Sequence, residues 1–88
     1  LRFNQGYADT AYTDLAAAMN VPAGKELDDW MTGFVAGIGL PTTLSALGVN
    51  AALLPSIAEK AALDHLSATN PRPAAASDYL SILQGAMA

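Results

Sequence analysis

Apolar residues recur at helical spacing along most of this chain. Residues three and four positions apart lie on one face of an α-helix, so a ladder with this spacing predicts an amphipathic helix. No stretch shows the two-residue alternation that is typical of a half-buried strand. The four ladders predict main helices over residues 8–19, 27–38, 51–66 and 76–87.

Residues that interrupt helices stand at the ends of these ladders. Asn20 tolerates the left-handed conformation that closes many helices, and Gly39 adopts it without a steric penalty. Asn50 is a good N-terminal cap for the third helix, and Pro55 fits only within the first turn of that helix. Two prolines separated by one residue predict an extended connector over Ser67–Pro73.

Glycines mark two further features of the chain. Gly48 follows Pro41–Leu47, for which we predict a short helix. Gly33 and Gly37 lie four residues apart inside the second ladder, where each glycine lowers helix propensity by up to about 1 kcal/mol. We interpret these two glycines as a place where another helix approaches closely.

The ladders also predict the buried side chains. We expect the main core to contain the second ladder together with one leucine that follows it, namely Leu27, Trp30, Phe34, Ile38 and Leu44. The third helix would bury a stripe of Leu54, Ile57, Ala58, Ala61 and His65, and the last helix Tyr79, Ile82, Leu83 and Ala86. The predicted fold class is all-α, a small helical bundle of about four main helices plus one short helix.

The amino-acid composition indicates that part of the surface of this chain is covered by another protein segment. Of the 88 residues, 52% are apolar and 14% are charged, whereas ordinary globular chains carry roughly 25% charged residues. A merely alanine-rich surface is the alternative explanation. If the surface is uncovered, we expect the isolated chain to form a homo-oligomer through the small-residue faces of residues 8–19 and 54–66.

Charge and cysteine content exclude several classes of function. The net charge is −4 and the four basic residues are scattered, so the chain lacks the clustered basic surface that nucleic-acid binding requires. No apolar run reaches about 18 residues, which argues against a membrane span. Residues 1–4 lack the features of a signal peptide, and we expect a cytoplasmic protein. The absence of cysteine rules out disulfides and thiolate metal sites within these residues.

Few side chains could carry chemistry. His65 is the single histidine, and Asp64 and Glu59 do not share a helix face with it at the spacing of a metal pair. Asp28 and Asp29 point about 100° apart on a helix and are better explained as charges that oppose the helix dipole. No serine lies in a nucleophile elbow, and no glycine-rich loop joins a strand to a helix. We therefore assign no catalytic, cofactor-binding or metal-binding residue to this chain.

One polar turn has two possible explanations. In Asn70-Pro71-Arg72-Pro73 a side-chain amide and a guanidinium are held on a stiff connector between two helices. As a structural turn, Asn70 would cap a helix end and Arg72 would bind backbone carbonyls of both helices. The alternative is a turn near the active site whose Asn70 and Arg72 contact an anion or a substrate.

The motifs of residues 38–87 resemble the C-terminal end of iron-containing (group III) alcohol dehydrogenases in order and spacing. The segments that carry the resemblance are Ile38–Val49, Leu54–Ala61 with its Leu-Pro start, the Asn70–Pro73 turn preceded by Asp64, and a closing helix from Asp78. Residues 1–4 are similar to the segment that follows the last metal-binding histidine of the family. One departure is the run Ala74–Ala76, where the family often has a Ser or Thr cap, so we expect the last helix to begin late or fray.

This resemblance implies a larger parent enzyme. Residues 1–88 would be the C-terminal part of a metal-binding helical domain, and an upstream domain would bind NAD(P). The divalent metal, iron or zinc, would be held by one Asp and three His upstream of Leu1, and it would polarise the alcohol oxygen during hydride transfer. The expected partners are therefore the N-terminal nucleotide-binding domain and the upstream metal-bearing helices. A maleylacetate-reductase-like enzyme and a non-enzymatic helical interaction module are the alternatives.

Overall fold

The computed structural model describes all residues, Leu1–Ala88, and every regular element in it is a helix. The predicted all-α fold class is confirmed, because each of the four ladders forms an α-helix and no strand occurs. Two compact units are present, Leu1–Leu40 and Pro41–Ala88. None of the helices has both the length and the apolar character that crossing a bilayer requires.

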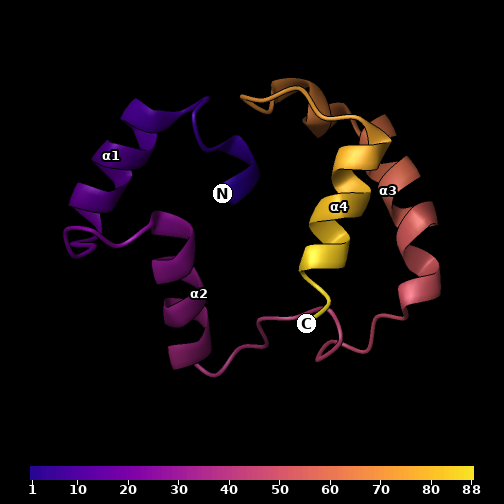
Figure 1. The fold of residues 1–88 in the computed structure, drawn as a ribbon, viewed down its shortest axis with the longest axis horizontal. Coiled ribbons are helices and arrows are strands. Elements are labelled where there is room, and N and C mark those ends of the chain that lie inside the picture. The colour runs from indigo at the N-terminus through magenta and orange to yellow at the C-terminus, as the bar shows by residue number, and fades with distance from the viewer. The chain divides into compact units, whose positions relative to one another are not determined.

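The first unit contains a short 3-10 helix and two α-helices. The elements are η1 (Arg2–Asn4), α1 (Asp9–Ala18) and α2 (Leu27–Gly37) (Figure 1). The predicted stop signals act as expected, because Asn20 and Gly39 adopt φ angles of 57° and 84°. Val21 N–H then bonds to Ala16 C=O and Asn20 N–H to Ala17 C=O, which is the Schellman pattern of helix closure.

The second unit packs two α-helices against each other. Its elements are η2 (Ala51–Leu53), α3 (Leu54–Leu63), η3 (His65–Thr69) and α4 (Ala76–Gly85), and α3 contacts α4 (Figure 1). Asn50 Oδ1 accepts the Ala52 N–H at 2.9 Å, so the predicted cap acts on η2. Pro55 lies in the first turn of α3, as predicted. Leu54 and Ala58 from the predicted stripe are buried, whereas Ile57 and His65 are exposed.

The predicted short helix over Pro41–Leu47 is wrong. Residues from Thr43 to Gly48 form turns, and Val49 N–H bonds to Leu44 C=O in a single Schellman-like closure around Gly48. The physical reason is a non-local competitor. Leu44 N–H bonds to the carbonyl of Ala86 at 2.8 Å, and Ser45 N–H bonds to that of Met87 at 3.3 Å. Two donors of the segment therefore bond to the C-terminal tail, whereas Ala46, Leu47 and Gly48 donate to acceptors three residues earlier, which closes turns and not an α-helix.

The third helix also ends earlier than predicted. α3 stops at Leu63 because Asp64 is extended and its side chain accepts the Leu66 N–H at 2.9 Å, which starts η3. Residues 65–69 are consequently a 3-10 helix, and the extended connector covers residues 70–75 only. The last helix begins at Ala76 as predicted, without the expected late start. Asp78 Oδ2 accepts the Ala75 N–H at 2.8 Å, which supplies half of a capping box even though alanine has no acceptor of its own.

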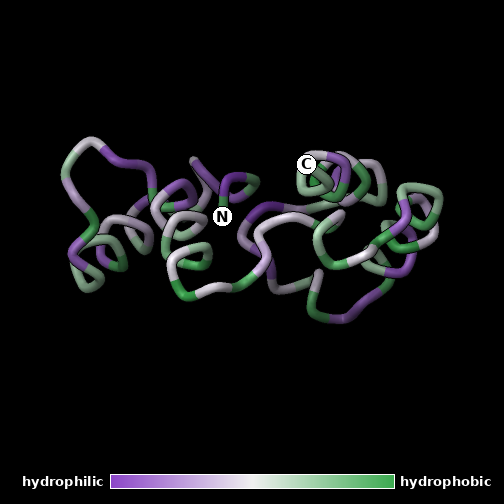
Figure 2. The backbone as a smooth tube through the Cα atoms, turned by 90° about the horizontal axis from the view of Figure 1, so that it is seen from below, coloured by the Kyte–Doolittle hydropathy of each residue, from purple (hydrophilic) through white to green (hydrophobic).

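The prediction of the main core is largely wrong for the second ladder. Leu27 is buried, but Phe34 is 48% exposed and Ile38 is 58% exposed. Trp30 and Leu44 are half-buried. The periodicity correctly placed Leu27, Trp30 and Phe34 on a helix, and hydrophobic positions recur along the helices (Figure 2). It did not reveal that nothing in the first unit covers the C-terminal half of α2.

Candidate functional site

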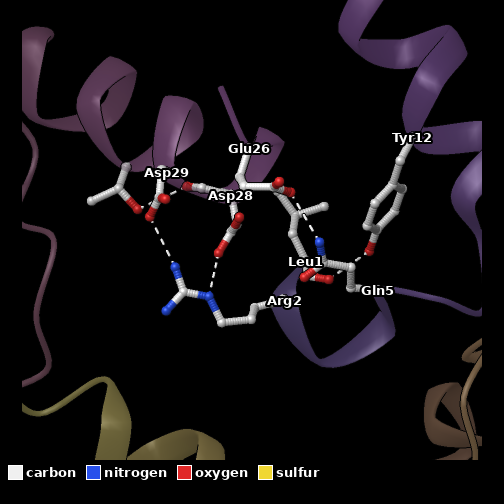
Figure 3. Close-up of polar contacts among 8 residues, drawn as sticks. Leu1, Arg2, Gln5, Tyr12, Glu26, Asp28 and Asp29 are labelled. Atoms are coloured by element: carbon white, nitrogen blue, oxygen red, sulfur yellow. Dashed lines mark hydrogen bonds and ion pairs between the residues drawn. The ribbon is translucent and has the colours of Figure 1, made fainter. Parts of the chain in front are cut away.

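A cluster of polar side chains joins η1 and α1 to the beginning of α2. Arg2 lies on η1, and its Nε and Nη2 donate to Asp28 Oδ2 and to Asp29 Oδ1, the latter at 2.8 Å (Figure 3). Gln5 Nε2 donates to Glu26 Oε2 at 2.9 Å. The three acidic residues lie at or beside the first turn of α2, where carboxylates also oppose the helix dipole.

The same cluster reaches α1 through a tyrosine. Tyr12 Oη donates to the carbonyl of Leu1 at 2.8 Å, so the start of the chain is tied to α1 as well as to α2 (Figure 3). Sequence reasoning placed Asp28 and Asp29 correctly as N-terminal charges but missed their partner. Arg2 is 26 residues away from Asp28, and no local spacing indicates such a contact.

Electrostatics at the cluster favour a permanently charged arginine. Hydrogen bonding to Asp28 is the main cause that raises the pKa of Arg2, and the negative charges of Asp28 and Asp29 raise it further. Arg2 is nevertheless solvent-exposed, so the pair is screened and resembles an ordinary surface salt bridge in strength. The cluster therefore holds the backbone of η1, α1 and the start of α2 in position.

A surface hollow of about 660 Å³ adjoins this cluster. Its acidic groups are already engaged, because Asp28 binds Arg2 and Asp9 Oδ1 accepts the Gly6 N–H at 2.8 Å. The hollow contains no histidine. Its residues therefore lack the convergent nucleophile, base or ligand set that catalysis needs.

His65 lies apart from any group of potential metal ligands. Its side chain is 89% exposed, and its Nδ1 is 3.6 Å from Asp64 Oδ1. Nowhere does the structure bring together three or more His, Cys, Asp or Glu side chains that could hold a metal ion. The residues of this chain thus do not fit the divalent metal that the sequence resemblance implies.

The turn that contains Asn70 and Arg72 connects η3 to α4. Asn70, the residue that ends η3, donates from its Nδ2 to the carbonyl of Arg72 at 2.6 Å, so its amide stabilises the turn that follows. Both side chains are half-buried. Beside the turn, the hydroxyls of Ser67 and Tyr79 lie 2.5 Å apart and link η3 to α4. A substrate-contacting role for Asn70 and Arg72 stays a prediction.

Comparison with known proteins decides between an enzyme family and a free module. The family described as "Fe-containing alcohol dehydrogenase family, C-terminal" matches residues 1–87. The chain belongs to this family. It is also 33% identical over 91 residues to a 4-hydroxybutyrate dehydrogenase of Cupriavidus necator, an alignment that covers 99% of this chain and 24% of that relative. No solved structure matches the chain.

The family assignment confirms the resemblance that was based on residues 38–87 and 1–4. The chain spans about a quarter of the length of the curated relative that it matches. The absence of a metal-ligand cluster is in keeping with this small share, because the chain corresponds to the C-terminal part of the family.

Proposed function

We propose that this chain is the C-terminal part of the helical domain of an NAD(P)-dependent alcohol dehydrogenase. The match to the iron-containing family over residues 1–87 carries the proposal. The parent enzyme would move a hydride between an alcohol carbon and the nicotinamide ring, and it would act in the cytoplasm. Its cofactor and its divalent metal would be bound by residues upstream of Leu1, since the residues present here do not fit a metal.

The proposed substrate class is short hydroxy acids with a terminal alcohol. Support comes from the relative named 4-hydroxybutyrate dehydrogenase, which aligns with 99% of this chain. Oxidation of the terminal alcohol of such an acid gives an aldehyde and leaves the carboxylate unchanged. The carboxylate distinguishes this class from simple alcohols, so the parent site would need a cationic or hydrogen-bonding partner for it.

The residues of this chain would support the site rather than perform chemistry. The Arg2 cluster fixes the entry of the chain onto α1 and α2, and the α3–α4 pair forms a packed unit with the Asn70–Arg72 turn at one end. These contacts would hold one wall of the helical domain in place. A rigid support of this kind matters because small displacements of catalytic groups reduce rates strongly.

The test is an assay of the full-length protein encoded by the reading frame that contains this chain. Reduction of NAD+ and NADP+ would be followed with 4-hydroxybutyrate and with simple primary alcohols. In the reverse direction, oxidation of NADH and NADPH would be followed with maleylacetate. We expect turnover with 4-hydroxybutyrate that exceeds turnover with an alcohol of equal length that lacks the carboxylate. Chelator-treated enzyme, assayed before and after addition of iron or zinc, is the control for metal dependence.

Two results would overturn the proposal. Absence of dehydrogenase activity with every alcohol, in protein loaded with metal, would refute the assignment of function. Preferred reduction of maleylacetate would replace the proposed substrate class with that of the alternative enzyme, whose members share the Asn-Pro-Arg-Pro turn of residues 70–73.

A further inference from the structure

The C-terminal half of α2 carries an exposed apolar stripe. Trp30 and Phe34 lie four residues apart on one side of α2, and Ile38, the C-terminal cap residue of the helix, continues this row at the same spacing. The rings of Trp30 and Phe34 stack with centroids 5.5 Å apart and planes at 18°. This stacking makes the stripe a continuous apolar surface. Phe34 and Ile38 on this surface are both exposed.

Two glycines open the helix surface beside this stripe. Gly33 and Gly37 precede Phe34 and Ile38 by one residue each, so they form a parallel row on the adjoining side of α2. A Cβ atom built on either glycine would meet no other atom within 4 Å. The row is therefore empty space next to an apolar ridge, which is the shape that lets a second helix approach closely.

Charge does not interrupt this surface. The run from Gly33 to Leu40 contains no polar side chain, and Leu40 at its end is exposed. The acidic residues of α2, Asp28 and Asp29, lie in its first turn and bind Arg2. An occupant of the surface must consequently be apolar, because a charged group placed there would lose its hydration without gaining a partner.

Scattered exposed apolar side chains are normal on proteins, but a contiguous patch usually marks an interaction surface. We propose that the stripe of α2 is the docking surface for an apolar helix of the same polypeptide, located upstream of Leu1 in the full-length protein. This inference rests on the proposed function, because that function assigns these residues to the C-terminal part of a longer helical domain.

Two observations favour an upstream segment over a second copy of the chain. The relative that aligns with this chain is about four times as long, so most of the proposed parent lies outside these residues. A tethered segment also has an effective concentration that reaches the millimolar range, whereas a second copy competes at its ordinary concentration. The tethered segment would therefore occupy the stripe first.

Cysteine labelling in the full-length protein tests this arrangement, since the present chain contains no cysteine. Ile38→Cys reports on the stripe, and Ala36→Cys is the matched control. Ala36 is exposed on the same helix and points about 200° away from Ile38. Each maleimide reaction would be followed by mass spectrometry of the labelled peptide and normalised to the rate of the same variant in denaturant.

We expect the Ile38→Cys variant to react at least about tenfold more slowly than the Ala36→Cys variant, which corresponds to about 1.4 kcal/mol of protection. The protection should not change with protein concentration. Equal rates would refute the docking surface. Protection that disappears on dilution would also overturn the proposal, because it would show that a second copy covers the stripe. Protection that persists in the isolated 88-residue chain would overturn it as well, because residues 41–88 would then be the segment that covers the stripe.

A size change in the glycine row gives an independent test. Gly37→Leu raises intrinsic helix propensity and meets empty space within this chain. If an upstream helix fills that space, the same variant should lower the Tm of the full-length protein, while the control Ala36→Leu should leave it nearly unchanged. A Tm for Gly37→Leu at or above the wild-type value would contradict close helix packing at this row.

These experiments separate the docking surface from the function. An active dehydrogenase with a fully reactive Ile38→Cys variant would refute the docking proposal alone. An inactive protein with a protected Ile38→Cys variant would refute the proposed function and leave the docking surface intact.

Discussion

Truncation of Leu54 should remove much of the stability of the second unit. Leu54 begins α3 and is 3% exposed, and with Ala58 it forms the buried part of the helix that contacts α4. Leu54→Ala deletes three carbon atoms. At about 0.8 kcal/mol for each, the lost transfer free energy is about 2.4 kcal/mol. The cavity left behind increases this value, so the expected loss lies within about 2–5 kcal/mol.

This loss is large compared with the stability that the unit can have. Pro41–Ala88 comprises about 50 residues, and domains gain roughly 0.05–0.15 kcal/mol per residue, which gives about 2–7 kcal/mol in total. We therefore expect Leu54→Ala to lower the urea midpoint strongly or to unfold the unit without denaturant. Far-UV circular dichroism is the appropriate assay, because the single tryptophan, Trp30, lies in the other unit.

The matched control is another leucine of the same helix. Leu63 ends α3 and is 87% exposed, so Leu63→Ala should change stability by no more than about 0.5 kcal/mol. Helix propensity favours both substitutions slightly and cannot explain a difference between them. If the two variants unfold at the same urea concentration, the α3–α4 contact does not form the core of this unit and the argument fails.

Four further outcomes are expected. Ala75→Ser adds the missing acceptor opposite Asp78 and should stabilise α4 by about 1 kcal/mol in urea unfolding; no change would mean that the cap does not form. Arg2→Gln should lower the Tm slightly at low salt and much less in 1 M salt, where charges more than about 3 Å apart are screened. Because the acidic partners raise the pKa of Arg2, deprotonation of the guanidinium should break the ion pair only in strongly alkaline solution. Elemental analysis of the purified chain should find substoichiometric iron and zinc, and a stoichiometric ion lost in a His65→Ala variant would contradict our assignment. Light scattering at micromolar concentration should give a mass above 9.0 kDa if exposed apolar faces drive self-association.

Local signals predicted the helices well because they act over a few residues. Asn20 and Gly39 close α1 and α2 through positive φ angles that their residue types permit, and Asn50 caps the helical turn that follows it. The family motifs could also be recognised from the sequence, because their order along the chain does not depend on tertiary contacts. The Asn70–Arg72 turn was identified as a connector, and an internal hydrogen bond stabilises it.

Non-local contacts account for the failures. In the turns of residues 43–48, Leu44 and Ser45 donate to the carbonyls of Ala86 and Met87, acceptors that lie more than 40 residues away in the sequence. Arg2 likewise binds Asp28 and Asp29, which lie 26 and 27 residues away in the sequence, and no local spacing rule predicts such a contact. A ladder identifies the apolar face of a helix, but it cannot identify what covers that face, so Phe34 and Ile38 were wrongly placed in the core.

The unusual composition and the unusual exposure have a common physical origin. Apolar surface that stays in water is unfavourable by about 25 cal/mol per Å². A chain that functions alone would therefore be expected to place charge where the second half of α2 and the residues just after it place Phe34, Ile38 and Leu40. Instead the charged residues of α2 gather in its first turn, and the remainder of the helix is uncharged. The first unit buries Leu27 as its one buried apolar side chain, which is too little to offset the entropy of ordering two helices. Its stability must therefore depend on an apolar contact outside the first unit, and the α2 stripe with its glycine row is a surface shaped to make such a contact.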